Sequence, residues 1–324
     1  MNENIKKLGT TDLDVSVIGH GLWGMGSWSG SDDHTSLDVL KVSAAMGCNF
    51  FDSAWAYGNG RSDRLLGELL RSGHWKGVVA SKVPPKNLKF PASPLDDYAD
   101  VFPRSHVIEL VEKILRATGL RTLPLLQLHV WDDHWVDAIE FHDTVRELKN
   151  RELIKHVGIS LNRWEPWNGI RAVEAKLVDT VQVIYNVFDQ APEDELFPAC
   201  RRNGVGVIAR VPLDEGSLGG RLTRETRFPA ADWRSRYFGP ENLPETITRV
   251  ERLRAILPAG MTLPELALRF VLSNPDVSTT IVGMRTIDHV RENMESRQRG
   301  PLAPELVAAL RSHRWDRRVT PWAN

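Results

Sequence analysis

Four side chains of this sequence could together carry proton-transfer chemistry: Asp52, Tyr57, Lys82 and His129. A tyrosine with its ordinary pKa of about 10 is a poor acid or base near neutral pH, but a neighbouring ammonium favours the ionised phenol and lowers that pKa. Lys82 could supply this charge, and Asp52 could keep Lys82 charged through an ion pair. His129 could donate a hydrogen bond that orients a carbonyl oxygen. Taken singly, such an Asp–Lys pair is more often a plain buried ion pair, and a histidine at a strand end is more often a rim residue.

The pattern around the first two of these residues is strand, loop, helix. Residues 49–51 form an apolar run that predicts a short buried strand, and residues 61–70 place leucines on one helical face, with Ser62 as the expected N-cap. Asp52 therefore ends a strand and Tyr57 lies in the loop that follows. In parallel α/β proteins, ligands bind at this end of the strands.

The same alternation of strand and helix continues along the chain. The expected strands are residues 15–18, 49–51, 77–82, 123–129, 154–160, 180–185, 205–211 and 279–282, and the expected helices are 35–46, 61–70, 106–118, 135–149, 170–175, 196–202, 263–272 and 288–294. Most strands are near-continuous apolar runs, which is typical of strands buried on both faces. The eightfold pattern predicts an α/β fold, a closed (β/α)8 TIM barrel, as one domain over residues 1–324.

Three segments lie outside this eightfold pattern. A turn at residues 9–12 predicts a short N-terminal β-hairpin, residues 304–313 predict an extra C-terminal helix, and a glycine-rich segment at 213–220 continues without a predicted element to residue 240.

In the barrel, Lys82 and His129 end the third and fourth strands. The four candidate side chains are therefore expected to converge at one end of the barrel, and four such residues in matching positions favour chemistry over coincidence.

Gly19, Gly21 and Gly24 spell G-x-G-x-x-G after a predicted strand, the pattern of a dinucleotide site in a doubly wound fold. That site requires a helix that begins within the glycine turn, so that its first amides face the diphosphate. Here the turn continues through further glycines and serines, and no helix can begin before about Asp32. We therefore favour the barrel over the doubly wound fold.

Composition excludes several classes of protein. The 41 lysines and arginines nearly balance the 42 acidic residues, so the chain has no basic excess for binding nucleic acid. It has no apolar run long enough for a membrane span, and its first residues lack the apolar core of a secretory signal. With only Cys48 and Cys200, a disulfide framework is not expected. We expect a cytoplasmic protein, of undetermined oligomeric state.

Two charged clusters do not indicate sites of their own. Residues 129–134 hold two histidines and two aspartates, but they match no metal-ligand spacing, and we expect no metal. The basic stretch at 311–318 is typical of a solvated terminal helix and tail rather than of a nucleic-acid surface.

With these residues in place, the sequence resembles the aldo-keto reductase superfamily over nearly its whole length. The resemblance is carried by the segments FFDSAWAYGNGRSDRLLGELL, VVASKV, LLQLHVW, VGISLN, VQVIYN, VPLDEGSLGG and TTIVGMRTIDHVRENM. It implies that the catalytic tetrad of the family falls on Asp52, Tyr57, Lys82 and His129, with Tyr57 as the acid-base group. All four residue types are present.

The resemblance also implies a binding site for a nicotinamide cofactor. Ser160, Asn162 and Gln182 would hold the carboxamide, Arg210 stands where many relatives place a stacking Tyr or Trp, and a loop around Gly216 would hold the diphosphate. The full implied set is Gly21, Leu22, Trp23, Asp52, Ser160, Asn162, Gln182, Arg210, Pro212, Leu213, Gly216, Ser217, Leu218, Gly220, Arg221, Gly283, Arg285, His289, Glu292 and Asn293.

Coenzyme preference depends on the segment VGMRTIDHVREN. The 2′-phosphate of NADPH requires fixed positive charge, which Arg285 and His289 could supply, with Asn293 near the adenine. Some relatives carry a lysine where this chain has Gly283, so NADH stays possible.

Four tryptophans follow predicted strand ends: Trp23, Trp55, Trp131 and Trp164. They predict an aromatic-lined slot for a substrate with an apolar body, or, alternatively, a cover over the barrel mouth.

We therefore expect an NADPH-dependent oxidoreductase that reduces a small-molecule aldehyde or ketone, with Tyr57 as proton donor. Three alternatives stay open: a sugar or alcohol dehydrogenase that runs in the oxidative direction, a cofactor-sensing regulatory protein similar to channel β-subunits, and a lyase or isomerase barrel indifferent to nicotinamide.

Overall fold

The computed structural model describes residues 4–26, 30–73, 75–230 and 232–317. Its centre is a closed barrel of eight parallel strands in the order β10-β3-β4-β5-β6-β7-β8-β9. The barrel strands are β3 (Ile18–Gly21), β4 (Phe50–Asp52), β5 (Val78–Val83), β6 (Leu123–Leu128), β7 (Ile154–Ser160), β8 (Thr180–Ile184), β9 (Gly206–Arg210) and β10 (Val277–Gly283). The predicted TIM barrel is thereby confirmed.

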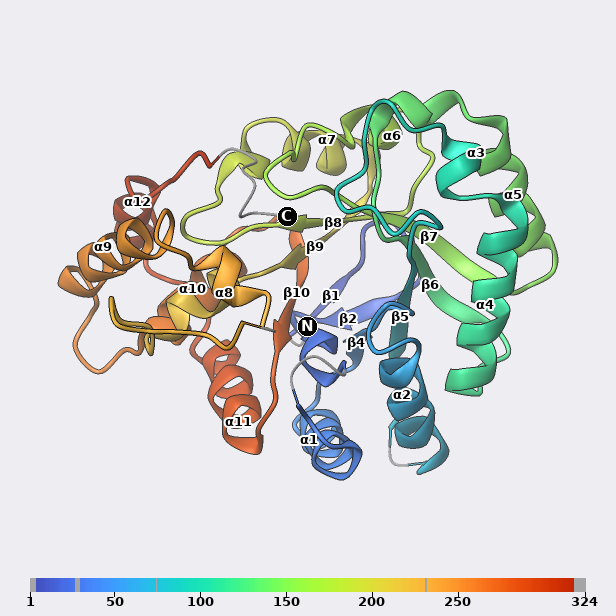
Figure 1. The fold of residues 1–324 in the computed structure, drawn as a ribbon. Helices are drawn as coiled ribbons and strands as arrows, with labels where there is room; N and C mark the ends of the chain where they lie inside the picture. Colours follow the sequence, from blue (N-terminus) through green and yellow to red (C-terminus); the bar gives the residue numbers. More distant parts are fainter. Residues whose placement is uncertain (1–3, 27–29, 74, 231, 318–324) are drawn as a thin grey trace.

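Helices surround the strands (Figure 1). One main helix follows each barrel strand: α1 (Asp33–Ala45), α2 (Arg61–Arg71), α4 (Arg104–Thr118), α5 (Ile139–Asn150), α6 (Ile170–Glu174), α7 (Leu196–Asn203), α10 (Leu263–Leu272) and α11 (Ile287–Ser296). Further helices lie in the loops and at the C-terminal end: α3 (Tyr98–Val101), α8 (Arg234–Tyr237), α9 (Leu243–Ala255) and α12 (Pro304–Arg311). Short 3-10 turns complete the loops: η1 (Trp23–Met25), η3 (Asp133–Asp137), η4 (Ala191–Glu193), η5 (Asp214–Gly219) and η6 (Arg297–Arg299).

The predicted N-terminal hairpin closes the amino end of the barrel. It consists of β1 (Ile5–Lys7) and β2 (Asp14–Ser16), and its apolar side chains share a buried cluster with residues from the barrel interior. Gly9, at φ +62°, lies so close to the start of β9 that a Cβ would stand 2.4 Å from the Gly206 nitrogen. Only glycine permits this approach, which lets Leu8 reach the barrel interior.

Several predicted boundaries are wrong. Val15 belongs to the hairpin, and the first barrel strand begins at Ile18, because the chain bends at Val17, directly after Ser16, whose amide donates to Asn49 Oδ1 at 2.5 Å. Helix α9 was not predicted, although Leu243, Ile247 and Val250 recur at helical spacing and are buried. Helix α1 begins at Asp33 with Asp32 as its N-cap, well after the glycine triplet, as expected.

Within the described ranges, no helix has both the length and the apolarity that a membrane crossing requires. Likewise, no cluster of three or more potential metal ligands is found in the described part of the chain.

Candidate active site at the carboxyl ends of the strands

The structure brings the four predicted catalytic residues together. Asp52 is the last residue of β4 and Lys82 lies near the end of β5, which neighbours β4. His129 directly follows β6, and its amide donates to the Val83 carbonyl at 3.0 Å. Tyr57 lies in the loop after β4, with its ring centroid 5.7 Å from that of His129.

A buried ion pair joins Lys82 to Asp52, whose side chains are 0% and 1% exposed. The Lys82 ammonium also donates to the Ser53 carbonyl at 2.9 Å and lies 3.5 Å from the Tyr57 hydroxyl. Asp52 Oδ1 accepts hydrogen bonds from the side-chain amides of Gln127 and Gln182, each at 2.9 Å. Both carboxylate oxygens therefore have donors, which fixes the carboxylate that holds the ammonium.

Sequence reasoning missed Gln127, and it did not foresee the contacts of Gln182 with Asp52 and Gln127. Gln127 is a polar residue in the apolar strand β6, opposite Lys82 in the register, and this position was a usable signal. Gln182 was expected at the cofactor carboxamide, but its Nε2 donates to Asp52 and to Gln127 Oε1. Its amide group belongs to the network that orients Asp52.

The charges of the cluster act on one another in a buried space. Burial raises the pKa of the Tyr57 phenol, and the Lys82 charge opposes this rise without cancelling it. The expectation that Lys82 brings this pKa below its ordinary value is therefore wrong for the structure as it stands. Burial also lowers the pKa of Lys82, but Asp52 and Tyr57 outweigh it and leave the Lys82 pKa above its ordinary value.

His129 is an uncharged hydrogen-bonding group near neutral pH. Burial, followed by the positive charges of Lys82 and Arg210, holds the pKa of His129 well below its usual range. Its Nδ1 atom is buried and has no hydrogen-bond partner among the described residues. A neutral imidazole can orient an oxygen by donating an N–H, but it has no extra proton to release.

The loop between β4 and α2 positions Tyr57. Helix α2 has Gly60 as its N-cap, at φ +82°, and a Cβ there would stand 2.5 Å from the Trp55 ring. Ser62 is therefore not the N-cap that the sequence predicted. Its hydroxyl instead pairs with the Ser53 hydroxyl at 2.7 Å, behind the catalytic cluster. Close packing of the Trp55 ring on Gly60 fixes the loop that carries Tyr57.

Phe90 borders the cluster and was not predicted. It lies in the long connection after β5, is 44% exposed, and meets the His129 ring edge-on at 5.1 Å between centroids. The Asn162 side chain holds the loop after β5 in place. Its Oδ1 accepts a hydrogen bond from the Ala92 amide at 3.1 Å, and its Nδ2 donates to Glu165 at 2.8 Å. In this structure the Asn162 amide thus supports the loop that carries Phe90.

Only part of the predicted tryptophan set lines the mouth of the barrel. Trp23 is 37% exposed and packs against Trp233 at 4.9 Å between ring centroids. Trp131 is 0% exposed, because it packs in the core beside Trp135, so its place in a substrate slot is a wrong prediction. Trp164 is 8% exposed and lies in a cluster with Tyr237.

The remaining residues predicted for the cofactor end their strands at the same face. Ser160 ends β7 and Arg210 ends β9. Arg210 donates to the Leu161 carbonyl at 3.0 Å, and its buried Nε has no partner among the described residues. Burial, followed by repulsion from Arg163, lowers the pKa of Arg210 to about 10. Gly21 pairs with Asp52 in the register, and the fully buried Leu22 donates its amide to the Asp52 carbonyl at 2.9 Å.

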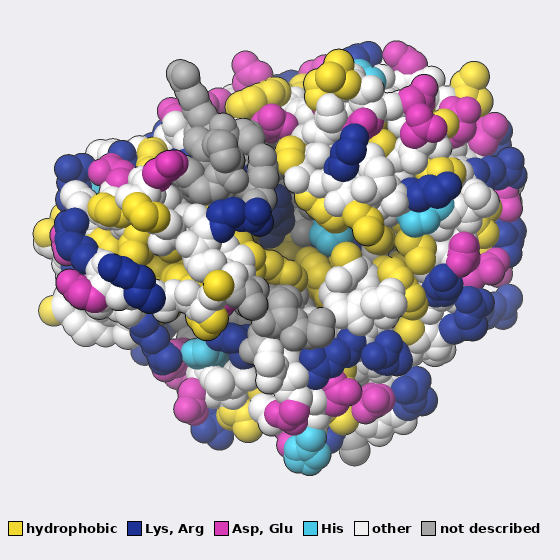
Figure 2. All heavy atoms as spheres, in the orientation of Figure 1, with side chains coloured by type: hydrophobic (Ala, Val, Ile, Leu, Met, Phe, Trp, Pro, Cys, Tyr) yellow, Lys and Arg dark blue, Asp and Glu magenta, His cyan; other side chains and the backbone are white. Residues whose placement is uncertain are grey.

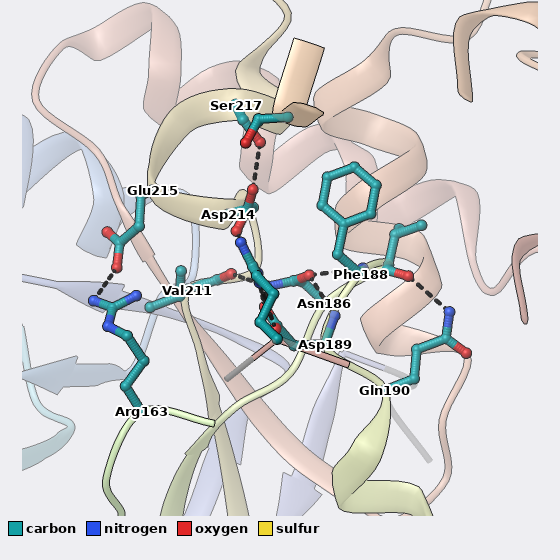
Figure 3. Close-up of polar contacts among 12 residues, drawn as sticks. Arg163, Asn186, Phe188, Asp189, Gln190, Val211, Asp214, Glu215 and Ser217 are labelled. Carbon is teal, nitrogen blue, oxygen red and sulfur yellow. Dashed lines mark hydrogen bonds and ion pairs between the residues drawn. The ribbon is translucent and has the colours of Figure 1, made fainter. Parts of the chain in front are cut away.

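The glycine-rich loop, residues 213–220, follows β9 after Pro212. Asp214, Glu215 and Gly216 all have left-handed backbones, at φ 44°, 55° and 104°. Such a conformation costs a non-glycine residue roughly 1–2 kcal/mol. Ion pairs hold both acidic residues of this loop. Asp214 pairs with Arg317 at 2.7 Å, and Glu215 pairs with Arg163 at 2.7 Å (Figure 3).

Two arginines and a histidine stand near the start of α11. Burial, followed by the charge of Arg221, lowers the pKa of His289; Arg285 also lowers this pKa, and Glu292 opposes the change. Thr286 caps α11 and accepts from the His289 amide at 3.2 Å. Gly283 is the last residue of β10 and is exposed. Glu292 is exposed on α11 and Asn293 is 5% exposed.

The residues of this face fit a dinucleotide. Gly216, Gly219 and Gly283 have no heavy atom within 4 Å of the place where a Cβ would stand, so their backbones are open to a ligand. Buried nitrogens of His129 and Arg210 lack partners among the described residues, which is the state expected of groups that await one. On this side of the molecule, hydrophobic side chains gather around a hollow near the centre (Figure 2).

A second cavity, of about 420 Å³, lies between the loops after β7 and β8 and the C-terminal segment. Trp164, Trp167 and Arg314 are among its lining residues. None of the four catalytic candidates borders it, so we place the reaction at the strand ends described above.

An eight-stranded barrel with ionisable side chains at the carboxyl ends of its strands is the arrangement of a TIM-barrel enzyme. A model of the aldo/keto reductase family matches residues 17–314. The chain belongs to this family, whose members act on small-molecule carbonyl substrates, and it is an NAD(P)H-dependent oxidoreductase.

Individual relatives are distant. The chain is 27% identical to the aldo-keto reductase YhdN of Bacillus subtilis, over 85% of this chain and 83% of that protein. It is also 27% identical to the NADH-specific methylglyoxal reductase of Escherichia coli, over 89% and 91%. The glycerol dehydrogenase of Gluconobacter oxydans has a similar fold, with a TM-score of 0.80, 23% identity and 99% of each chain covered.

Proposed function

We propose that this enzyme reduces an aldehyde or ketone to the alcohol with NADPH, and that Tyr57 donates the proton. The observation that carries the proposal is the placement of the Tyr57 hydroxyl 3.5 Å from the buried Lys82 ammonium, beside the neutral His129. When bound, NADPH supplies the hydride for the carbonyl carbon.

Each residue of the cluster has a separate task in this proposal. Tyr57 releases its proton to the carbonyl oxygen, and Lys82 stabilises the phenolate that this leaves. Asp52 keeps Lys82 charged and in place. His129 donates a hydrogen bond to the same oxygen but is not the acid, because its low pKa leaves it without a spare proton.

The substrate is proposed to have an apolar or aromatic body. Phe90 and Trp23 are both partly exposed, and Phe90 touches the imidazole that would orient the carbonyl. An aromatic wall next to the reacting group favours an apolar substituent there, because binding removes apolar surface from water.

The cofactor is proposed to lie across the ends of β7, β9 and β10. Gly21, Ser160, Asn162 and Arg210 would surround the nicotinamide end, and loop 213–220 would take the diphosphate. The two arginines Arg221 and Arg285 support NADPH over NADH, since a 2′-phosphate requires fixed positive charge, and His289 beside them can donate a hydrogen bond. NADH is the alternative, since the Escherichia coli relative is an NADH-specific reductase.

Two measurements test the function. Tryptophan fluorescence titrated with NADPH and NADH gives both dissociation constants, and a panel of aldehydes and ketones gives turnover. Tyr57→Phe should lower kcat by about 10²–10⁴-fold and leave NADPH binding unchanged. Tyr98→Phe is the matched control, because this buried phenol packs against Phe102, outside the cluster. Full turnover by Tyr57→Phe would refute the assignment.

A separate pair of variants tests the coenzyme. Arg285→Ala should raise the dissociation constant of NADPH by about tenfold, which is the loss of one charge-assisted contact, and change that of NADH much less. Arg291→Ala, at an exposed position of helix α11 shortly after Arg285, is the control. Equal effects of Arg285→Ala on both coenzymes would remove the proposed preference.

A further inference from the structure

The side chain of Arg317, near the C-terminal end of the described chain, joins several loops at the barrel mouth. Its guanidinium pairs with Asp189 in the loop after β8 and with Asp214 in loop 213–220, the latter at 2.7 Å. It also donates to the Tyr237 hydroxyl at 2.9 Å and lies 4.9 Å from the centroid of the Trp164 ring. The arginine is only 2% exposed, and Asp214 is 0% exposed.

The network extends from these carboxylates into the backbone around loop 213–220. The Asn186 side-chain amide donates to Asp189 at 2.8 Å and to the Val211 carbonyl at 3.0 Å, and the Ser217 hydroxyl donates to Asp214 at 2.6 Å (Figure 3). Val211, just before loop 213–220, and Ser217, within it, are thus both linked to the carboxylates that Arg317 binds.

Two features show that loop 213–220 needs such support. Asp214 and Glu215 have left-handed backbones, which residues with side chains disfavour. Both also carry negative charge in a loop that would meet an anion. The two ion pairs, with Arg317 and Arg163, hold these residues in place and offset their charges, although Arg317 is shared with Asp189.

We propose that Arg317 is a positioning residue for the dinucleotide: it fixes loop 213–220 and offsets part of the charge of Asp214, so that the loop accepts the diphosphate. This inference rests on the proposed function, which assigns the loop to the diphosphate. If the loop is competent for binding in only a tenth of the molecules, the apparent dissociation constant rises about tenfold.

The C-terminal segment docks independently of Arg317. The Trp315 amide donates to the Phe188 carbonyl at 2.8 Å, and the Leu310 carbonyl accepts from Gln190 at 2.9 Å. Arg314 pairs with Asp194 at 2.6 Å and does not contact loop 213–220 through any ion pair in the described chain. Arg314→Met is therefore a matched control for Arg317→Met.

The test measures NADPH and NADH binding to the full-length protein by tryptophan fluorescence, together with stopped-flow dissociation rates. Arg317→Met should raise both dissociation constants by about tenfold, mostly through faster dissociation. It should raise the KM for the coenzyme more than it lowers kcat. Arg314→Met should stay within about twofold of the wild type.

Asp214→Asn is the second variant, because removal of Arg317 leaves two buried carboxylates and could unfold the chain. It keeps the Arg317–Asp189 pair, weakens the ties of Asp214 to Arg317 and to the Ser217 hydroxyl, and removes the negative charge of Asp214, so faster coenzyme dissociation in this variant supports the positioning role of these ties. If Arg317→Met does not fold, Asp214→Asn decides. Wild-type dissociation rates in each folded variant would overturn the inference, whereas a wild type that binds neither coenzyme would overturn the proposed function itself.

Discussion

Replacement of Lys82 by methionine should damage both the stability and the chemistry of this enzyme. The Lys82 ammonium makes an ion pair with Asp52 and a 2.9 Å hydrogen bond to the Ser53 carbonyl, in a site where the two charged side chains are at most 1% exposed. Lys82→Met leaves the Asp52 carboxylate buried without a cation. Loss of one partner from a buried pair costs about 3–5 kcal/mol. Since two amides still donate to Asp52, we expect about 3 kcal/mol.

A double-mutant cycle separates the lone charge from other effects of the substitution. Urea denaturation of Lys82→Met, Asp52→Asn and the double variant gives three free energies of unfolding. The double variant contains no unpaired charge, so we expect it to be more stable than the sum of the single losses predicts, by about 2 kcal/mol. Strictly additive losses would refute the account of this pair.

The pH dependence of the same variant tests the link to Tyr57. Burial already sets the Tyr57 pKa above its ordinary value, and the Lys82 charge acts against this rise. Without Lys82 the Tyr57 pKa should therefore rise further. Alcohol oxidation needs the phenolate, so its rate should increase with pH in the wild type, and in Lys82→Met the same increase should occur at higher pH. An unshifted profile would show that Lys82 does not act on the phenol.

Three further predictions concern other residues. Burial raises the pKa of Asp63 to about 6, above the 3.8 of an exposed aspartate, so the folded state binds this proton more tightly and stability falls as pH rises through that window. Asp63→Asn should thus stabilise the protein by up to about 3 kcal/mol at pH 8 and by little at pH 4, as thermal unfolding at both pH values will show. Phe90→Ala should lower kcat/KM by about tenfold for aromatic aldehydes and much less for glycolaldehyde; equal losses would remove Phe90 from the substrate wall. Trp131→Ala should cost about 3–5 kcal/mol of unfolding free energy, and Trp23→Ala less than about 1 kcal/mol, because only Trp131 is fully buried.

Periodicity predicted the architecture because each barrel strand is a nearly continuous apolar run. Strand β7 and helix α10 lie at the predicted residues, 154–160 and 263–272. Helix α9 was missed because it lies within a long insertion and does not belong to the strand–helix repeat, although its apolar spacing is visible. The first strand was misplaced because Val15, Val17 and Ile18 form one apolar stretch, while a long-range hydrogen bond to Asn49 decides where the hairpin ends.

The sequence predicted those residues of the candidate site that lie at or just after the end of a strand. Tyr57, Lys82 and His129 were found because they terminate or closely follow strands that share one edge of the barrel. Partners that come from distant elements carry no local signal. Gln182 is 130 residues from Asp52, and Arg317 is 128 residues from Asp189, so only the folded structure reveals these contacts.

The N-terminal hairpin has a consequence for the order of events in turnover. With Leu8 and its neighbours packed into the amino end, the described part of the barrel leaves its opposite end as the route by which ligands come and go. If the coenzyme lies across the strand ends, as proposed, it must enter before the smaller substrate covers the cluster, and must leave after it. We therefore expect compulsory-order kinetics, with the coenzyme first on and last off.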